Sequence, residues 1–202
     1  MRLVKSTADR VGAAVALVLV TPVLLALVAL VKVTSPGPAF FTQRRVGRSG
    51  RPFHLYKFRT MTHHAEEAKD AVRPDGTRND AADSLLFKLR HDPRTTRVGA
   101  FLRRYSLDEL PQLWNVVKGD MSLVGPRPHL SEETARMDPA ALRRLAVRPG
   151  LTGLWQVSGR SDLDWETTVR LDTFYADNWS VAGDLRILAK TLPAVIKGRG
   201  AY

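Results

Sequence analysis

The sequence lacks cysteine altogether in a chain of 202 residues. Without cysteine the protein has no disulfide bonds, no metal sites built from thiolates and no cysteine nucleophile. The absence is compatible with a reducing compartment. The chain also has no internal repeat and no low-complexity tract. Its length therefore predicts one domain with an attached segment.

Acidic residues are few relative to basic ones. There are 20 Asp and Glu against 31 Lys and Arg, which gives a net charge of +11 at pH 7. An excess of this size favours polyanionic partners. Three classes of partner stay open at this point: nucleic acid, anionic lipid and phosphate-bearing substrates.

Charge is missing completely from Val11 to Val31. As a helix this run is roughly 30 Å long at about 1.5 Å per residue, close to the hydrocarbon thickness of a bilayer. A cleaved signal peptide is disfavoured, because the run is long and Lys32 follows it without a small-x-small cleavage site. A straight span and a re-entrant helical hairpin remain. Thr21 and Pro22 lie at the middle, where proline removes a hydrogen bond and predicts a kink or break.

Basic residues flank this run on both sides and mark the cytoplasmic side of a membrane. They are Arg2, Lys5 and Arg10 before the run and Lys32, Arg44, Arg45, Arg48 and Arg51 after it. The richer flank after the run places the following domain in the cytoplasm. Two basic flanks and a central proline favour the re-entrant form. We therefore predict a membrane-embedded re-entrant helix over residues 1–34, broken at Thr21 and Pro22, and a cytoplasmic domain over residues 35–202.

A short β-hairpin is predicted directly after the membrane segment. Residues 40–47 are typical of a strand or an interfacial stretch, residues 47–52 of a turn, and residues 53–61 alternate as in a second strand. Lys57 and Arg59 share one face of that second strand. This face is either a solvated surface or a phosphate-binding pair.

Two adjacent carboxylates, Asp108 and Glu109, form the chemical centre of the sequence. Ser106 and Glu109 match a capping box, which makes a purely structural role one alternative. Pro111 complicates this alternative, because proline fits the first position of a helix that runs to Lys118, with Gly119 as its stop. The spacing alone leaves capping and catalysis equally open. In both versions the carboxylates lie at a helix N-terminus. The free N–H groups there favour anions, so we expect Asp108 to stay ionised and a phosphate to bind beside it.

Arginines stand on both sides of this pair. Arg103 and Arg104 precede it, and Arg127 follows between Pro126 and Pro128. The two prolines restrict the backbone, which suits a guanidinium that clamps a phosphate. The alternative is an ordinary exposed arginine in a turn.

The spacing of apolar and polar residues predicts that the remaining third of the chain is mainly helical. A glycine-rich piece over residues 148–160 offers Trp155 and Gln156 to a ligand, although such pieces are common in loops. Helices are predicted over residues 139–145, 165–179 and 181–196. The last is amphipathic and is either a core helix or a helix on a membrane surface. The fold class is therefore α+β, a membrane helical hairpin followed by a small, mainly helical domain with a β-hairpin and interfacial amphipathic helices.

Several motifs together resemble those of the bacterial sugar transferases, the monotopic polyprenyl-phosphate phosphoglycosyl transferases. They occur in the expected order over nearly the whole chain. They are residues 35–38, 56–61, 106–119, 121–128, 148–160 and 197–202. Larger relatives carry extra N-terminal membrane helices, so this chain looks like the catalytic unit alone, with residues 35–202 as the catalytic domain.

The resemblance implies a reaction. A phosphosugar passes from a UDP-sugar to undecaprenyl phosphate, giving undecaprenyl-diphosphate-sugar and UMP, as the first membrane step of exopolysaccharide, O-antigen or other glycan assembly. Asp108 is then the nucleophile that forms an aspartyl-phosphosugar intermediate, and Glu109 helps to hold Mg²⁺. The implied substrate-binding residues are Lys57, Arg59, Arg103, Arg127, Arg148, Gln156 and Arg160. The implied location is the bacterial inner membrane, with the catalytic domain facing the cytoplasm.

The alternative from another class is a membrane-tethered basic module that binds anionic lipid or nucleic acid without catalysis. It explains the net charge but neither the carboxylate pair nor the prolines around Arg127, so we expect no nucleic acid partner. The motifs favour glucose or galactose as the sugar without deciding it. The oligomeric state also stays open, with a homo-oligomer as one alternative.

Overall fold

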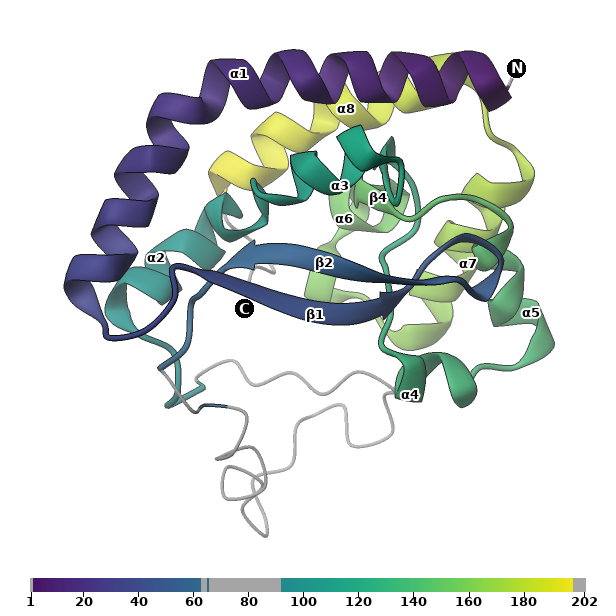
Figure 1. Cartoon of the computed structure of the whole chain (residues 1–202). Helices are drawn as coiled ribbons and strands as arrows, with labels where there is room; N and C mark the ends of the chain where they lie inside the picture. Colours follow the sequence, from purple (N-terminus) through teal and green to yellow (C-terminus); the bar gives the residue numbers. More distant parts are fainter. Residues whose placement is uncertain (1, 63–64, 66–91, 198–202) are drawn as a thin grey trace, which may run out of the picture.

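The computed structural model describes residues 2–62, 65 and 92–197. The first element is α1 (Arg2–Thr34), a single continuous helix and, within the described residues, the one helix long and apolar enough to cross a membrane. The membrane segment is thus one helix without an interruption, and its re-entrant course stays a prediction. Figure 1 shows that α1 nevertheless bends about half-way along its length.

Pro22 lies inside α1 and gives the bend its physical cause. Its ring nitrogen has no hydrogen to donate, so one backbone hydrogen bond of the helix is lost. The neighbouring Thr21 hydroxyl donates to the carbonyl of Leu17 at 2.7 Å, a contact that also bends helices. The helix is kinked rather than interrupted at the predicted position.

The β-hairpin is confirmed. Strand β1 (Phe40–Val46) pairs antiparallel with β2 (Pro52–Phe58), with Arg45 opposite Phe53 and Phe41 opposite Lys57. The turn between them contains a 3₁₀ helix, η1 (Arg48–Gly50). The second strand ends earlier than predicted, so Arg59 lies just beyond it.

Helices cover this hairpin on one side, and both halves of α1 contribute. Ala13 of the first half packs with Phe53, Leu55 and two residues of α3 (Gln112–Lys118). Leu27 and Val31 of the second half pack with Ala39, Phe58 and Leu102, the last on α2 (Arg97–Arg104). These two apolar clusters tie both halves of α1 to the same folded domain.

The C-terminal part is built around a short parallel pair of strands, β3 (Ser122–Val124) and β4 (Gly150–Thr152). The elements around it are α4 (Ser131–Ala135), α5 (Pro139–Leu142), η3 (Arg143–Ala146), α6 (Leu154–Ser158), η4 (Arg160–Asp162), α7 (Trp165–Asp177) and α8 (Val181–Lys197). Helix α7 begins after Asp164, whose side chain accepts a hydrogen bond from the Thr167 N–H.

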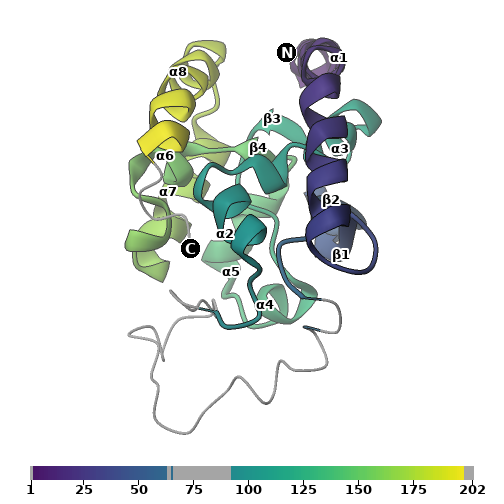
Figure 2. The same ribbon diagram turned by 90° about the vertical axis from the view of Figure 1, so that its left-hand side faces the viewer.

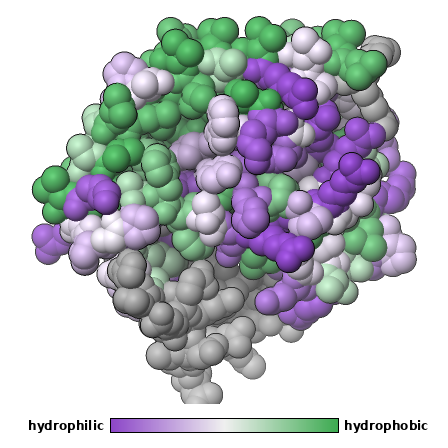
Figure 3. Space-filling view, viewed as in Figure 1, coloured by the Kyte–Doolittle hydropathy of each residue, from purple (hydrophilic) through white to green (hydrophobic). Residues whose placement is uncertain are grey.

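Helix α8 and the first half of α1 lie at the same end of the molecule, farthest from α4 (Figures 1 and 2). The apolar face predicted for α8 points outward, with Leu185, Leu192 and Ile196 each more than 60% exposed. This finding excludes the core-helix alternative for that face. Hydrophobic residues accordingly line the upper edge of the surface in Figure 3.

Candidate active site

The carboxylate pair lies in a tight 3₁₀ turn, η2 (Leu107–Glu109), directly before α3. Ser106 has a left-handed backbone, with φ of 53°, and its side chain makes no capping hydrogen bond, so the capping-box alternative is wrong. Pro111 stands immediately before α3, one residue earlier than the predicted first position, and Gly119 ends the helix in the left-handed region. The turn therefore presents both carboxylates from a rigid proline-bounded segment.

Lys57 on β2 lies between the two carboxylates. Its Nζ is 2.7 Å from Glu109 Oε1 and 3.6 Å from Asp108 Oδ2. Asn115 on α3 fixes this geometry, because its amide oxygen accepts from the Tyr56 N–H at 3.1 Å and its amide nitrogen donates to the His54 carbonyl at 2.7 Å. The strand that carries Lys57 is thus held against the helix that follows the carboxylates.

The two carboxyl groups are in different electrostatic environments. Burial raises the pKa of Asp108, which is only 6% exposed, while Lys57 and Arg103 act against this rise. Burial also works to raise the pKa of Glu109, but Lys57 and Arg127 outweigh it, and that pKa is lowered. We expected the helix terminus to favour ionised Asp108, and burial opposes this. Environments that push two carboxyl pKa values apart are typical of pairs with separate chemical roles.

Three of the predicted arginines surround the pair. Burial lowers the pKa of Arg103, and the charge of Asp108 counteracts this effect. Arg103 is also oriented by donating from Nε to Thr60 Oγ1 at 2.9 Å. Arg127 and Arg160 both attract the Glu109 carboxylate, and the Arg127 guanidinium stacks over a tryptophan ring at 5.6 Å. That ring belongs to Trp155, which is 3% exposed and so is not the open stacking face that the sequence suggested.

A pocket opens at the Glu109 side of the pair. Its lining residues are Arg45, Leu55, Lys57, Glu109, Gln112, Arg127, Pro128, Gly150, Leu151 and Gln156. The predicted residue Gln156 is among them, with its Nε2 donating to the Leu151 carbonyl at 3.4 Å. Its Oε1 is buried and makes no hydrogen bond within the described part of the chain. This amide oxygen is an acceptor that a ligand can use.

Two predicted substrate-binding arginines lie elsewhere and hold α1. Arg59 donates from Nη2 to the Ser35 carbonyl and hydroxyl, both at 2.8 Å, and from Nη1 to the Pro36 carbonyl, at the end of α1. Arg148 donates from Nη1 to Ser6 Oγ at 3.0 Å, near the beginning of α1. The structure does not bring these two guanidinium groups to the carboxylate pair.

Two pocket residues, Arg45 and Gln112, were missed by sequence reasoning. In the sequence alone, Arg45 stands out only as one of the basic residues that flank the membrane segment. The signal that identifies it is the strand alternation: Arg45 lies opposite Phe53 in the hairpin, so it shares the face of Leu55 and Lys57, whereas Arg44 lies on the other face.

The donor set at the carboxylate pair is compatible with Mg²⁺. Among the described residues there is no group of three or more His, Asp or Glu side chains that could hold a metal. Mg²⁺ is usually bound by one or two carboxylates together with water and substrate phosphates. Glu109 fits such a role, because its pKa is lowered and its carboxylate reaches the pocket.

Comparisons with known proteins agree over the length of the chain. An exopolysaccharide production protein, ExoY, of Rhizobium meliloti is 47% identical over 98% of this chain and 88% of that protein. An undecaprenyl-phosphate galactose phosphotransferase of Salmonella typhimurium is 45% identical over 100% of this chain and 42% of that protein. A UDP-glucose:undecaprenyl-phosphate glucose-1-phosphate transferase of Xanthomonas campestris is 38% identical over 98% of this chain and 40% of that protein.

The chain therefore spans most of ExoY and less than half of the other two relatives. The family model described as bacterial sugar transferase matches residues 1–198, which include the carboxylate pair, the pocket and α1. The chain belongs to the bacterial sugar transferase family.

Proposed function

We propose that this protein transfers a phosphosugar from a UDP-sugar to undecaprenyl phosphate and releases UMP. The observation that carries this proposal is the carboxylate pair bridged by Lys57 at the edge of a basic pocket. The printed names of the Salmonella and Xanthomonas relatives, both transferases that act on undecaprenyl phosphate, support the acceptor.

Asp108 is the proposed nucleophile. Its Oδ attacks the sugar-bearing phosphorus, the bond from that phosphorus to the oxygen of UMP breaks, and UMP leaves with the bonding electrons. A phosphate oxygen of the lipid then attacks the same phosphorus and releases the Asp108 carboxylate. A covalent intermediate divides one difficult transfer into two steps. Burial suits this role, because a poorly hydrated carboxylate with a raised pKa is a stronger nucleophile.

The remaining charges stabilise the diphosphate. Lys57 and Arg127 lie at the pocket, and Arg103 lies behind Asp108. Positive groups that are already in place offset the charge that moves during phosphoryl transfer. Glu109 is the proposed Mg²⁺ ligand, and a bound Mg²⁺ would neutralise part of the diphosphate charge.

We further propose that α1 is re-entrant and that the catalytic domain faces the cytoplasm. Near its beginning, Lys5 forms an ion pair with Asp184 of α8 at 2.6 Å. Near its end, Val31 packs in the same cluster as Phe58 of β2. One folded domain contacts both ends, which a straight span would place on opposite sides of the bilayer. The basic residues on both flanks of α1 favour the cytoplasmic side.

The reaction is tested with a panel of radiolabelled UDP-sugars, undecaprenyl phosphate and Mg²⁺. We expect label in the organic phase with at least one UDP-hexose, and only when the lipid acceptor is present. Incubation with the donor alone, followed by mass spectrometry, should add one sugar-phosphate mass to the peptide that contains Asp108. Absence of lipid product across the panel would exclude the reaction, and absence of the adduct would exclude the intermediate.

The topology is tested by single-cysteine labelling, which is clean because the chain has no cysteine of its own. A re-entrant α1 predicts that Ser6→Cys is labelled by an impermeant reagent only from the cytoplasmic side. Ser131→Cys on α4 is the matched control, because it lies on the domain in either topology. Labelling of Ser6→Cys from the outside, with the control protected, would establish a span.

A further inference from the structure

Arg45 brings a basic group to the pocket from a strand with no role in the mechanism above. The hairpin register places it opposite Phe53, four residues before Lys57 on β2. At about 3.3 Å per residue, the Cα atoms of Arg45 and Lys57 are thus offset by roughly 13 Å along the strands. Both side chains line the same pocket, so it has a basic group toward each end.

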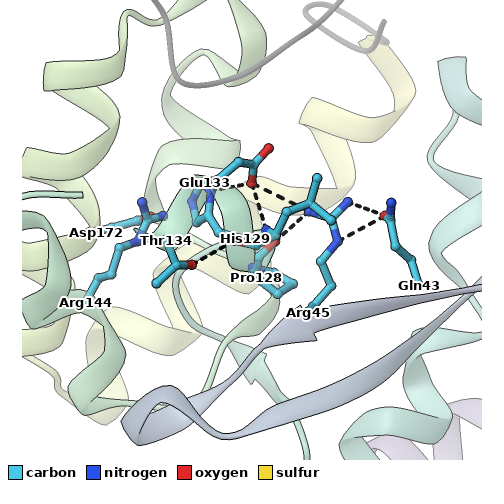
Figure 4. A network of polar contacts seen from close by, with 9 residues as sticks. Gln43, Arg45, Pro128, His129, Glu133, Thr134, Arg144 and Asp172 are labelled. Atoms are coloured by element: carbon cyan, nitrogen blue, oxygen red, sulfur yellow. Dashed lines mark hydrogen bonds and ion pairs between the residues drawn. The ribbon is translucent and has the colours of Figure 1, made fainter. Parts of the chain in front are cut away.

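The Arg45 guanidinium is held in a defined orientation. Its Nε and Nη2 donate to Gln43 Oε1 at 3.1 and 2.6 Å, and its Nη1 donates to the Pro128 carbonyl at 3.3 Å. Figure 4 shows this network, in which Nη1 also lies 3.8 Å from Glu133 Oε2. The side chain is only 12% exposed. A guanidinium fixed in this way loses little conformational entropy when it binds an anion.

The net positive charge of the pocket lining favours the binding of an anion at the Arg45 end. Its lining contains three basic side chains, Arg45, Lys57 and Arg127, and one acidic side chain, Glu109. Lys57 is engaged by the carboxylate pair at 2.7 Å from Glu109. Glu133, whose Oε2 lies 3.8 Å from Arg45 Nη1, offsets part of the charge at the other end. The lining and Glu133 together have three basic and two acidic side chains, which leaves one positive charge in excess. A phosphate is the ligand that this excess favours, because a planar guanidinium matches its geometry.

The position of Arg45 in the fold distinguishes the two phosphates of the reaction. Strand β1 lies on the side of β2 that faces away from α1, and α4, which carries Glu133, lies at the end of the molecule opposite to α1 and α8 (Figures 1 and 2). A lipid phosphate approaches from the apolar face formed by α1 and α8. The Arg45 guanidinium lies 3.8 Å from Glu133 of α4, the helix at the opposite end, and so suits the soluble half of the donor.

We propose that Arg45 binds the phosphate of the nucleotide half of the donor, the phosphate that leaves as UMP. This inference rests on the proposed function and adds a residue that selects the donor rather than the lipid. Arg45 and Arg127 then hold the diphosphate from two sides, with Pro128 between them in contact with Arg45.

The test compares Arg45→Gln with Arg44→Gln, a neighbouring arginine that is exposed on the opposite face of β1. UMP binding is measured by calorimetry on the full-length protein in detergent, without turnover. We expect Arg45→Gln to raise the Kd for UMP by about 10- to 100-fold, the size typical of a lost charged hydrogen bond. Arg44→Gln should leave Kd within about two-fold.

Initial rates then separate the two substrates. Arg45→Gln should raise the KM for the UDP-sugar by a similar factor and leave the KM for undecaprenyl phosphate unchanged. Arg45→Lys keeps a charge at the site without the planar fork and should give an intermediate Kd. Arg45→Lys also tests the proposal if Arg45→Gln fails to fold. A Kd for UMP of the Arg45→Lys variant equal to that of the wild type would overturn the proposal.

The other outcomes are also decisive. An unchanged Kd for UMP in a folded Arg45→Gln variant, or a rise confined to the KM of the lipid, would overturn the proposal. Wild-type protein that binds UMP through Arg45 but forms no lipid product would instead overturn the proposed function and leave the role of Arg45 intact. The binding and turnover measurements thus keep the two failures apart.

Discussion

Two clusters of acidic and basic side chains differ in their access to solvent. The open cluster consists of Lys57, Asp108 and Glu109, and it reaches the pocket. The closed cluster consists of His129, Glu133, Arg144 and Asp172 (Figure 4). Arg144 and Asp172 form an ion pair in which each side chain is 1% exposed.

The closed cluster surrounds the loop that carries Arg127. The backbone N–H of Arg127 favours the ionised form of Asp172, although burial dominates and raises the pKa of that carboxyl to about 7. The His129 carbonyl accepts a hydrogen bond from the Val46 N–H at 2.9 Å. The centroid of the His129 ring lies 5.6 Å from that of the Trp165 ring. Similar residue types therefore have different surroundings: the open cluster reaches the pocket, and the closed cluster holds the loop.

The largest predicted effect separates activity from stability at the open cluster. Asp108→Asn should lower turnover by about 10⁴-fold or more, because the nucleophile is lost. Burial raises the pKa of Asp108, so its charge is unfavourable in the folded state. The variant should therefore unfold at the same or a higher temperature than the wild type. Product formation near the wild-type rate would contradict the assignment of the nucleophile.

The converse is predicted for the closed cluster. Asp172→Asn leaves the Arg144 guanidinium, which is 1% exposed, without its anionic partner, whereas Lys57 keeps Glu109 when Asp108 is changed. Above pH 7, where the Asp172 carboxyl is ionised, this loss costs about 3–5 kcal/mol of folding free energy. In a chain of this size such a loss lowers the melting temperature by roughly 10 °C or more. Thermal unfolding of purified protein in detergent measures the effect. The double variant Arg144→Met with Asp172→Leu removes both charges and should be more stable than Asp172→Asn alone.

The sequence predicted the two clusters unequally. Asp108 and Glu109 were identified because neighbouring carboxylates stand out against a basic chain, and the proline and glycine around them located the turn and helix. Nothing local indicated that Arg144 pairs with Asp172, since that contact depends on how η3 packs on α7. The contacts of Arg59 and Arg148 also depend on tertiary packing. The motifs assign both arginines to the substrate, whereas in the structure they contact the two ends of α1.

A third prediction concerns pH and tests whether His129 is part of the closed cluster. Burial lowers the pKa of His129 to about 4 from an ordinary value of 6.5, with Arg144 and Arg127 acting in the same direction and the Glu133 contact against it. The unfolded chain therefore binds a proton between pH 6.5 and 4 that the folded state does not. Stability present above pH 6.5 is lost as the pH falls, by about 3 kcal/mol at pH 4.

The measurement is the free energy of unfolding against pH for the wild type and for His129→Gln. Asp172 titrates in both proteins, with the opposite sign because its pKa is raised. Glu133 loses its His129 contact in the variant and titrates only below pH 4.5, so above that pH the difference between the two curves reports His129. The difference should grow steadily from pH 6.5 to 4. Two parallel curves would mean that the imidazole is not held neutral by burial.

The smallest effect is predicted for an ion pair that differs from the closed one mainly in exposure. Arg143 and Arg144 are neighbours on η3, and their partners Asp177 and Asp172 both lie on α7. The Arg143–Asp177 pair is 2.7 Å long, with side chains that are 64% and 42% exposed. Asp177→Asn should cost less than about 1 kcal/mol and leave turnover unchanged, because water solvates the arginine that remains. If Asp177→Asn destabilises the protein as strongly as Asp172→Asn, burial is not what makes the closed cluster sensitive.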